Sequence, residues 1–144
     1  MPDRAAIEKQ SWRESFDRIS NGGPGIETLL TMAWDGGVAA GRISVERLVD
    51  LLSTTPARLF GMPGKGAVEV GRDADIVLFD PAGRHTIRAA DLHHTSDYTP
   101  YEGLEVQGAI RSTILRGRFV VRDGSFVGTR GFGRFLGRRL EPMP

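Results

Sequence analysis

The sequence predicts an α+β fold in which helices precede strands along the chain. The first 62 residues are typical of loop and helix, with apolar residues at helical spacing from residue 26 onward, whereas the second half carries short apolar runs rich in β-branched side chains. Turn residues, many of them among the 19 glycines, separate those runs. Helices followed by strands favour two segregated layers or subdomains over alternating βαβ units.

Three helices are expected in the first half. The first is predicted from residue 26 to about residue 40, after the sharp Asn-Gly-Gly-Pro-Gly turn of residues 21–25. Ser44 is a residue type that caps helix N-termini, and it predicts a second helix. Thr55-Pro56 predicts the start of a short third helix, which Gly61 would end.

Strands are expected in the second half, at residues 74–79, 110–115, 119–122 and 125–127, with a further edge strand at 85–87. Two dipeptides between them, Arg116-Gly117 and Asp123-Gly124, predict tight turns. Asp-Gly is a strong hairpin signal because both residues tolerate positive φ. The sequence contains no internal repeat.

Length and composition limit the classes of function. The chain of 144 residues suffices for one ordinary domain or two small subdomains. Cysteine is absent, which excludes disulfides, thiolate catalysis and cysteine metal sites. The net charge of +1 argues against general nucleic-acid binding. No apolar run approaches the roughly 20 residues that span a bilayer, and no signal peptide opens the chain, so we expect a cytoplasmic protein without a membrane partner.

Arginines and phenylalanines cluster near the end of the chain. The cluster comprises Arg130, Phe132, Arg134, Phe135, Arg138 and Arg139. It could form a basic-aromatic surface for RNA, or it could be a tail that packs on a neighbouring surface or lies in solvent. No stacking platform or basic fold motif accompanies the cluster, which favours the second interpretation.

Six phrases carry a resemblance to a known family. They occupy residues 19–27 (Ile-Ser-Asn-Gly-Gly-Pro-Gly-Ile-Glu), 41–44, 53–61, 65–80 (with its central Gly-Arg-Asp-Ala-Asp), 97–103 (Asp-Tyr-Thr-Pro-Tyr-Glu-Gly) and 122–128. With these phrases the chain resembles the C-terminal part of the hydantoinase/dihydropyrimidinase family of cyclic amidohydrolases. The resemblance runs from about residue 3 to residue 136. The phrase at 97–103 narrows it to this branch, which also includes non-enzymatic relatives.

The resemblance implies a fragment with three parts. Residues 1–62 would be the terminal helices of a TIM-like barrel, residues 63–128 the C-terminal part of a β-sandwich, and residues 129–144 a tail that contributes to a homotetramer. The intact relative would hold two metal ions, with zinc expected, that activate a water for attack on a ring amide. The ring would be a hydantoin or a dihydropyrimidine.

Two residues receive site roles from the resemblance. Asp3 stands where the family has a metal-ligand aspartate, although Arg4 replaces the histidine that usually follows; the alternative is an exposed acidic residue on a frayed terminus. Asn21 would bind the cyclic amide of the substrate through its backbone; the alternative is a helix-leading turn without a ligand. The family's other metal ligands have no match, so no catalytic residue is assigned and the chain alone is expected to be inactive.

Two further groups invite a site interpretation. His93 and His94, with Asp91 and Asp97, have the residue types of a metal cluster. Adjacent side chains of an extended segment point to opposite faces, which favours a structural or surface role for the histidines. Both tyrosines of the 97–103 phrase could contact substrate, but packing residues with hydroxyls bonded to backbone are favoured.

The sequence therefore supports a piece of a metal-dependent hydrolase of cyclic amides. The alternative is a non-catalytic dihydropyrimidinase-like protein, or an assembly module that uses the sandwich for association. In either case a barrel that ends at these helices would leave Leu29, Leu30, Val49 and Leu52 without their usual neighbours, and we expect exposed apolar surface.

Overall fold

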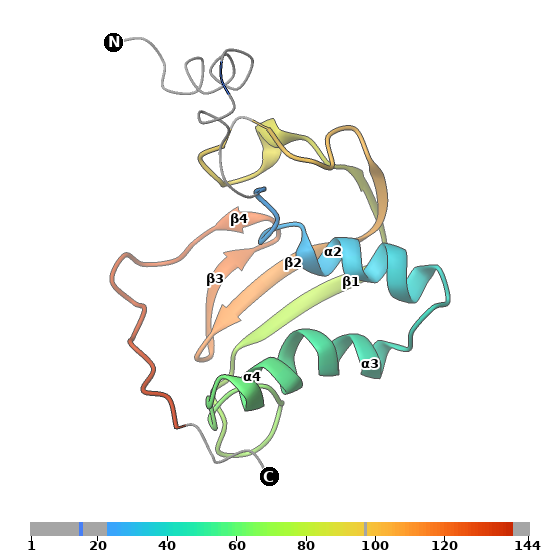
Figure 1. The fold of residues 1–144 in the computed structure, drawn as a ribbon. Helices are drawn as coiled ribbons and strands as arrows, with labels where there is room; N and C mark the ends of the chain where they lie inside the picture. The colour runs from blue at the N-terminus through green and yellow to red at the C-terminus, as the bar shows by residue number, and fades with distance from the viewer. Residues whose placement is uncertain (1–14, 16–22, 97, 140–144) are drawn as a thin grey trace.

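The computed structural model describes residue 15, residues 23–96 and residues 98–139. Figure 1 shows helical segments followed by an antiparallel sheet. The elements in chain order are α2 (Leu29–Ala33), η2 (Trp34–Ala39), α3 (Val45–Val49), η3 (Asp50–Thr54), α4 (Thr55–Leu59), β1 (Ile76–Thr86), η4 (Ala89–Asp91), β2 (Glu105–Leu115), β3 (Arg118–Arg122) and β4 (Ser125–Phe126). The predicted order of helices before strands is confirmed.

The first helix consists of α2 and η2, and its second half is a π-helix. The backbone N–H of Ala40 donates to Asp35 O at 3.2 Å, which is the five-residue spacing of a π-turn. Gly36 and Gly37 lie inside this segment. Glycine has a low helix propensity, so a wider helical turn is tolerated where the two glycines stand. The predicted helix is confirmed, with a start at Leu29 rather than at residue 26.

The second helix starts as the sequence predicts. Ser44 has extended backbone angles, and its hydroxyl accepts a hydrogen bond from the backbone N–H of Arg47 at 3.2 Å. This contact satisfies one of the N–H groups that lack an intrahelical partner at the start of a helix.

The predicted third helix is confirmed as α4, which begins at Thr55, although α3, η3 and α4 follow one another without a break. Pro56 has no N–H to donate to the preceding turn. The chain accommodates it by widening: the N–H of Thr55 donates to Asp50 O, five residues back. Gly61 ends the helix as expected, with φ at 64° and its N–H bound to Arg58 O at 3.1 Å.

The sheet is a four-stranded antiparallel meander in the order β1-β2-β3-β4. The predicted strand at 74–79 and the predicted edge strand at 85–87 are parts of one strand, β1, so the expectation of two strands is corrected. A register shift between Asp80 and Arg84 marks a bulge that contains Pro81 and Gly83. The Asp80 carboxylate holds the bulge by accepting a hydrogen bond from the N–H of Ala82 at 3.0 Å.

Both predicted hairpin turns are confirmed. Arg116 and Gly117 have φ of 44° and 77°, and Asp123 and Gly124 have φ of 49° and 77°. Positive φ at both central residues is the pattern that matches the right-handed twist of paired strands. The two turns connect β2 to β3 and β3 to β4.

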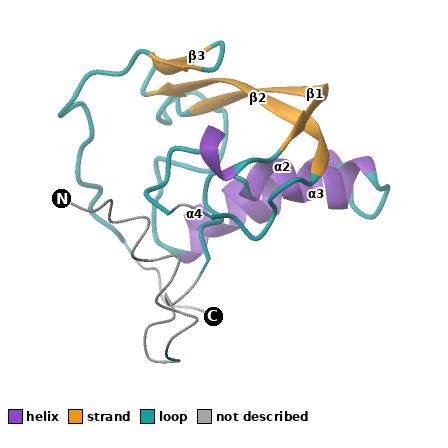
Figure 2. Cartoon of the chain, turned by 90° about the horizontal axis from the view of Figure 1, so that it is seen from above, coloured by secondary structure: helices purple, strands orange, loops and turns teal. Residues whose placement is uncertain are grey.

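The helices cover one face of the sheet, so the unit has two layers (Figure 2). They approach each other closely at Gly108 of β2, beside a ring contact in which the centroids of Trp34 and Phe79 lie 5.0 Å apart. Beside it, the backbone N–H of Gln107 donates to the carboxylate of Asp35 at 2.8 Å. The helical layer and the sheet are therefore joined by an aromatic contact and a hydrogen bond.

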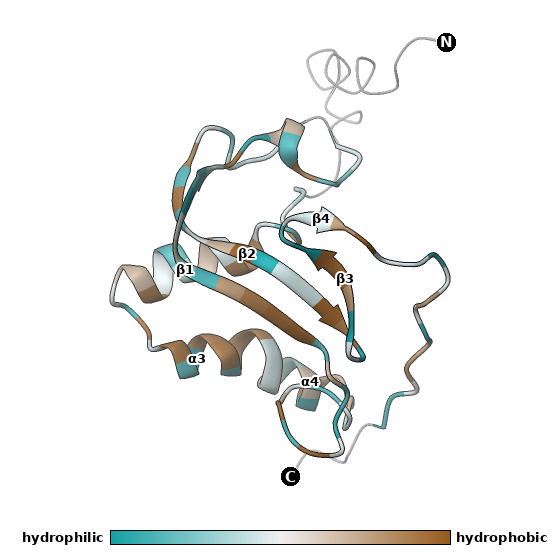
Figure 3. Cartoon of the chain, turned by 180° about the vertical axis from the view of Figure 1, so that it is seen from behind, coloured by the Kyte–Doolittle hydropathy of each residue, from teal (hydrophilic) through white to brown (hydrophobic). Residues whose placement is uncertain are grey.

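The apolar core of this unit is small. Its buried apolar residues among those described are Leu48, Ala57, Ile87 and Val106. Figure 3 shows further apolar residues along α3 and along the strands. The expectation of uncovered apolar surface is confirmed for Leu29, 54% exposed, and Val49, 51% exposed, whereas Leu30 and Leu52 are half-buried.

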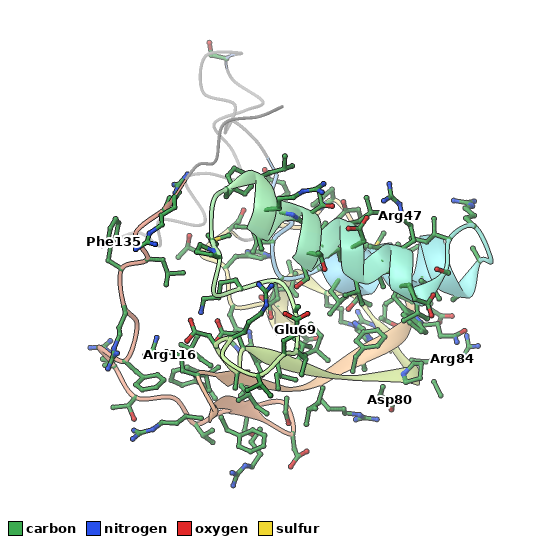
Figure 4. All side chains as sticks on the ribbon, turned by 90° about the horizontal axis from the view of Figure 1, so that it is seen from below. Arg47, Glu69, Asp80, Arg84, Arg116 and Phe135 are labelled. Atoms are coloured by element: carbon green, nitrogen blue, oxygen red, sulfur yellow. The ribbon has the colours of Figure 1, made fainter. Side chains whose placement is uncertain are left out.

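The segment after β4 runs along one side of the molecule toward the end of α4 (Figure 1). The ring of Phe132 lies under the guanidinium of Arg116, 4.3 Å from its centre. Further along, the N–H of Arg139 donates to Gly61 O at 2.8 Å. Phe135 is 97% exposed and extends from the tail (Figure 4). Part of the basic-aromatic cluster therefore packs on the chain's own surface, as the favoured interpretation holds.

We predict that Gly108→Ala destabilises the fold by about 3 kcal/mol, because the new methyl group overlaps aromatic carbons and Gly108 has positive φ. An ideal Cβ at Gly108 would lie 2.4 Å from Phe79 Cζ and 2.7 Å from Trp34 Cδ1, with φ at 97°. Urea unfolding measures the loss.

The matched control is Gly117→Ala, since Gly117 also has positive φ but no atom within 4 Å of its ideal Cβ. This variant should lose only about 1 kcal/mol, the backbone cost. Equal losses in the two variants would contradict the role of the aromatic contact.

Candidate functional site

The turn that leads into α2 lies against the loop that follows η4. An ideal Cβ on Gly23 would lie 3.9 Å from Cγ of Pro100, which is an ordinary van der Waals distance. The hydroxyl of Thr28, a buried residue, donates to Gly25 O at 3.3 Å and closes the turn. Thus residues 23–28 and the loop around Pro100 form one surface, although they are far apart in the sequence.

Glu27 and His93 join the same two segments. The backbone N–H of His93 donates to Oε2 of Glu27 at 2.7 Å, and Nδ1 of the same histidine lies 2.8 Å from Oε1. Burial opposes ionisation of Glu27, but its hydrogen bonds to His93 outweigh that effect, and its pKa falls below 4.5. The hydrogen bond to Glu27 and its charge raise the pKa of His93 above 6.5. Both groups are thus favoured in their charged forms.

The predicted site residues Asp3 and Asn21 lie outside the described residues. Gly23 and Gly25, which belong to the same phrase as Asn21, are described, and Gly23 lies beside Pro100. The roles of Asp3 and Asn21 stay predictions.

The histidine cluster does not assemble as a metal site within the described ranges. His93 pairs with Glu27, and both ring nitrogens of His94 are enclosed without a hydrogen-bond partner there. No group of three histidines, cysteines or carboxylates that could hold a metal ion occurs among the residues that the structure describes. Asp97 lies outside those residues.

The 97–103 phrase holds the ends of β1 and β2 together. The N–H of Gly103, with φ at 77°, donates to Ile87 O at 2.9 Å, and the N–H of Ile87 donates to Leu104 O at 2.9 Å. Glu102 accepts a hydrogen bond from the N–H of Ala89 at 2.7 Å and so fixes the start of η4. The phrase therefore continues the strand pairing beyond the sheet.

Both tyrosines of this phrase are described. Tyr101 is half-buried, as a packing residue should be, and Tyr98 is 40% exposed. Whether their hydroxyls bond to backbone stays a prediction. The buried side chain of this phrase is that of Thr99, whose hydroxyl accepts a hydrogen bond from the N–H of Tyr101 at 3.3 Å.

The 65–80 phrase connects the helices to the sheet. Its first residue, Lys65, pairs with two aspartates of the same phrase. Lys65 Nζ lies 2.8 Å from Asp73 Oδ2 and also contacts Asp75. The other carboxylate oxygen of Asp75 accepts a hydrogen bond from the N–H of Arg116 at 2.8 Å. Gly66 has φ at 88°, and its ideal Cβ would lie 2.6 Å from that of Ala57, so no larger residue fits under α4. Lys65 and Gly66 thus both have structural roles in this phrase.

Sequence reasoning did not identify Glu27, Lys65 or Glu102 as organising residues. All three lie within phrases that carry the family resemblance. Their partners are 66, 10 and 13 residues away, and only the folded chain reveals such pairs.

The comparisons with known proteins decide the family. The model of the amidohydrolase family matches residues 17–120. The chain belongs to the amidohydrolase family. Within it, the resemblance to hydantoinases and dihydropyrimidinases is confirmed: the chain is 45% identical over 132 residues to a D-hydantoinase of Geobacillus stearothermophilus, a match that covers 91% of this chain and 28% of the relative.

Solved structures agree with this placement in the amidohydrolase family. D-hydantoinase from Bacillus sp. AR9 superposes with a TM-score of 0.89 at 46% identity, covering 94% of this chain and 30% of that one. Dihydropyrimidinase from Brevibacillus agri superposes with a TM-score of 0.91 at 44% identity, covering 99% and 31%. The chain thus spans about a third or less of the length of these amidohydrolases.

Amidohydrolases of the hydantoinase type are metal-dependent. Two ions and a bridging hydroxide require several convergent ligands. Two neighbouring carboxylates, Asp73 and Asp75, already pair with Lys65, and no group of three ligand-type residues that could hold a metal ion occurs among the described residues. The described part of the chain does not fit a metal pair, and no reaction step through a metal follows from it.

Among the described residues, no helix is long and apolar enough to cross a membrane.

We predict that Lys65→Met destabilises the fold by about 1–2 kcal/mol near neutral pH, because two neighbouring carboxylates lose their cation. The pKa of Asp75 is lowered from 3.8. Burial opposes ionisation of Asp75, but the hydrogen bonds from Lys65 and Arg116 outweigh the effect of burial. The stability that Asp75 contributes is therefore present above pH 3.8 and lost as the pH falls through its folded pKa. The difference between wild type and variant should shrink in the same acid range.

Urea unfolding at several pH values measures this difference, with Arg47→Met as the control. Arg47 pairs with Asp50 on an exposed helix face, and such a pair contributes about 0–1 kcal/mol. If Lys65→Met lowers the free energy of unfolding no more than Arg47→Met does, the ion pairs of Lys65 are not needed for stability.

Proposed function

We propose that this chain is the C-terminal part of a metal-dependent hydrolase that opens cyclic amides, namely hydantoin or dihydropyrimidine rings. The observation that carries the proposal is the 45% identity to a D-hydantoinase over 91% of the chain. In this proposal residues 1–62 are terminal helices of a TIM-like barrel, residues 63–128 belong to a β-sandwich, and residues 129–144 are a tail. The intact protein would act in the cytoplasm, without a nucleic-acid or membrane partner.

Asn21 is the proposed substrate-binding residue, through its backbone. Glycines follow it at positions 22, 23 and 25, and glycine lets a main chain approach a ligand closely. The placement of Gly23 against Pro100 supports a defined position for this part of the chain. Asp3 is the proposed metal ligand, and zinc is the proposed metal, which would supply an activated water in the intact enzyme.

A second candidate function is that of a non-catalytic relative or an assembly module. The exposed apolar side chains of the tail, Phe135 and Leu136, favour it. Apolar and aromatic residues flanked by arginine are typical of interfaces between proteins. A homo-oligomer is also part of the first proposal, so association alone does not separate the two.

We predict that the chain alone does not open hydantoin or dihydrouracil, even with added zinc or manganese. At most one proposed metal ligand, Asp3, is present, and a single carboxylate cannot hold a metal pair. The measurement is turnover by the purified chain beside a metal-only blank. Turnover well above the blank that is lost on Asp3→Ala would contradict the proposal.

The positive arm is a chimera in which this chain replaces the matching segment of the Geobacillus stearothermophilus D-hydantoinase. The chimera should turn over hydantoin, and Asp3→Ala should lower kcat/KM by about 100-fold through loss of metal. Asn21→Pro, which removes a backbone N–H, should cost about 10-fold or more, whereas Asn21→Ala should cost little because it keeps that N–H. A folded, assembled but inactive chimera would favour the non-catalytic alternative.

We predict that Phe135 and Leu136 mediate association between copies of the chain. Exposed apolar side chains gain free energy when a partner covers them. Light scattering coupled to size-exclusion chromatography should show oligomers for the wild type and smaller species for Phe135→Ser combined with Leu136→Ser. Arg134→Ser, at another exposed position in the same tail, should leave the mass unchanged. An unchanged mass in the double variant would refute the assignment.

A further inference from the structure

Two contacts connect the loop after η4 to the turn before α2, and a third contact closes the turn itself. Glu27 binds His93 through both carboxylate oxygens, at 2.7 and 2.8 Å. Thr28, the next residue, donates to Gly25 O at 3.3 Å. Gly23 then meets Pro100, at 3.9 Å from an ideal Cβ. The turn is thus fixed at its start, its middle and its end.

The geometry of the Glu27 contact suits positioning better than stabilisation. The side chain of His93 is 80% exposed, and an exposed ion pair contributes little to the free energy of unfolding. A carboxylate that accepts from a backbone N–H and a ring nitrogen of one residue has a fixed direction, however. The pair therefore defines where residues 23–28 lie relative to the loop, at small cost to stability if it is broken.

We propose that Glu27 and His93 are positioning residues for the proposed substrate-binding phrase, since they set the place of the turn that follows Asn21. The inference rests on the proposed role of Asn21. Because Asn21 is only two residues before Gly23, its reach is limited to about 7 Å from the fixed end of the turn. Neither Glu27 nor His93 needs to touch the substrate for this role.

The pair should make the turn sensitive to pH. The contact is strongest while Glu27 is ionised and His93 is protonated, so it weakens as the pH rises through the raised pKa of His93. Other charged or titratable groups surround it. His94 belongs to the same loop and favours ionised Glu27, while His85, Arg88 and Asp91 line the same open cleft from β1 and η4.

The test is an NMR titration of the 144-residue chain, which needs no catalytic activity. The amide resonances of Gly23 and Gly25 should shift with the midpoint of the His93 ring, above pH 6.5. Glu27→Gln and His93→Ala should both abolish that shift, while the urea midpoint of unfolding stays close to that of the wild type. The proposal would be overturned if the amide resonances of Gly23 and Gly25 do not shift as His93 titrates, or if they still shift with pH in Glu27→Gln.

Two control variants match the chemical changes. Glu105→Gln removes an exposed carboxylate from the start of β2, and His85→Ala removes a histidine of the same cleft. Both should keep the pH-dependent shift of Gly23 and Gly25. Loss of the shift in either control would mean that general charge, rather than the Glu27–His93 contact, moves the turn.

The chimera with the Geobacillus stearothermophilus enzyme gives a second readout. Glu27→Gln should raise KM for hydantoin by about threefold to tenfold and leave kcat within about twofold, because a lost positioning contact weakens substrate binding. A fall in kcat with unchanged KM would overturn the positioning role. An inactive wild-type chimera would count against the proposed function alone, since the NMR titration would still decide whether the pair fixes the turn.

Discussion

The meeting of the helical layer and the sheet at Gly108 is the constraint on which the rest of the structure depends. With few buried apolar residues elsewhere among those described, the Trp34–Phe79 contact over a residue without a side chain is the main apolar joint between layers. The hydrogen bond from Gln107 to Asp35 orients the same joint. A small core cannot absorb a displacement at this point, because neighbouring contacts are too few to compensate.

Polar contacts provide further links between the helices, the sheet and the loop after η4. Lys65 ties two aspartates of the connection between helix and sheet, and Glu27 ties the start of the helical layer to the loop after η4. Both are partly solvated, so they specify geometry more than they add free energy. Contacts that fix geometry without adding much free energy suit the proposed function, since a chain segment that binds substrate through its backbone needs a defined position rather than a deep core.

Much of the fold was predictable from local signals, and the site was not. Ser44, Gly61 and the two hairpin turns have backbone requirements that a residue type reveals directly. The helix predicted at Thr55-Pro56 is present, and a π-turn joins it to the helix before it; the error in β1 arose because a bulge joined two runs. Glu27 and Lys65 escaped notice because their partners are distant in sequence. Asp3 and Asn21 rest on the family resemblance, which the comparisons support as membership in the amidohydrolases and not residue by residue.

The order of the strands has a kinetic consequence. Two-residue turns join β2 to β3 and β3 to β4 and close small loops, whereas the longer segment of residues 87–104 connects β1 to β2. The contact of Glu27 with His93 closes a loop of 66 residues, and the conformational entropy of closure grows with loop length. The β2–β3–β4 part of the sheet can therefore form early in folding, whereas the surface beside the proposed substrate-binding phrase is completed late and is among the first parts to open.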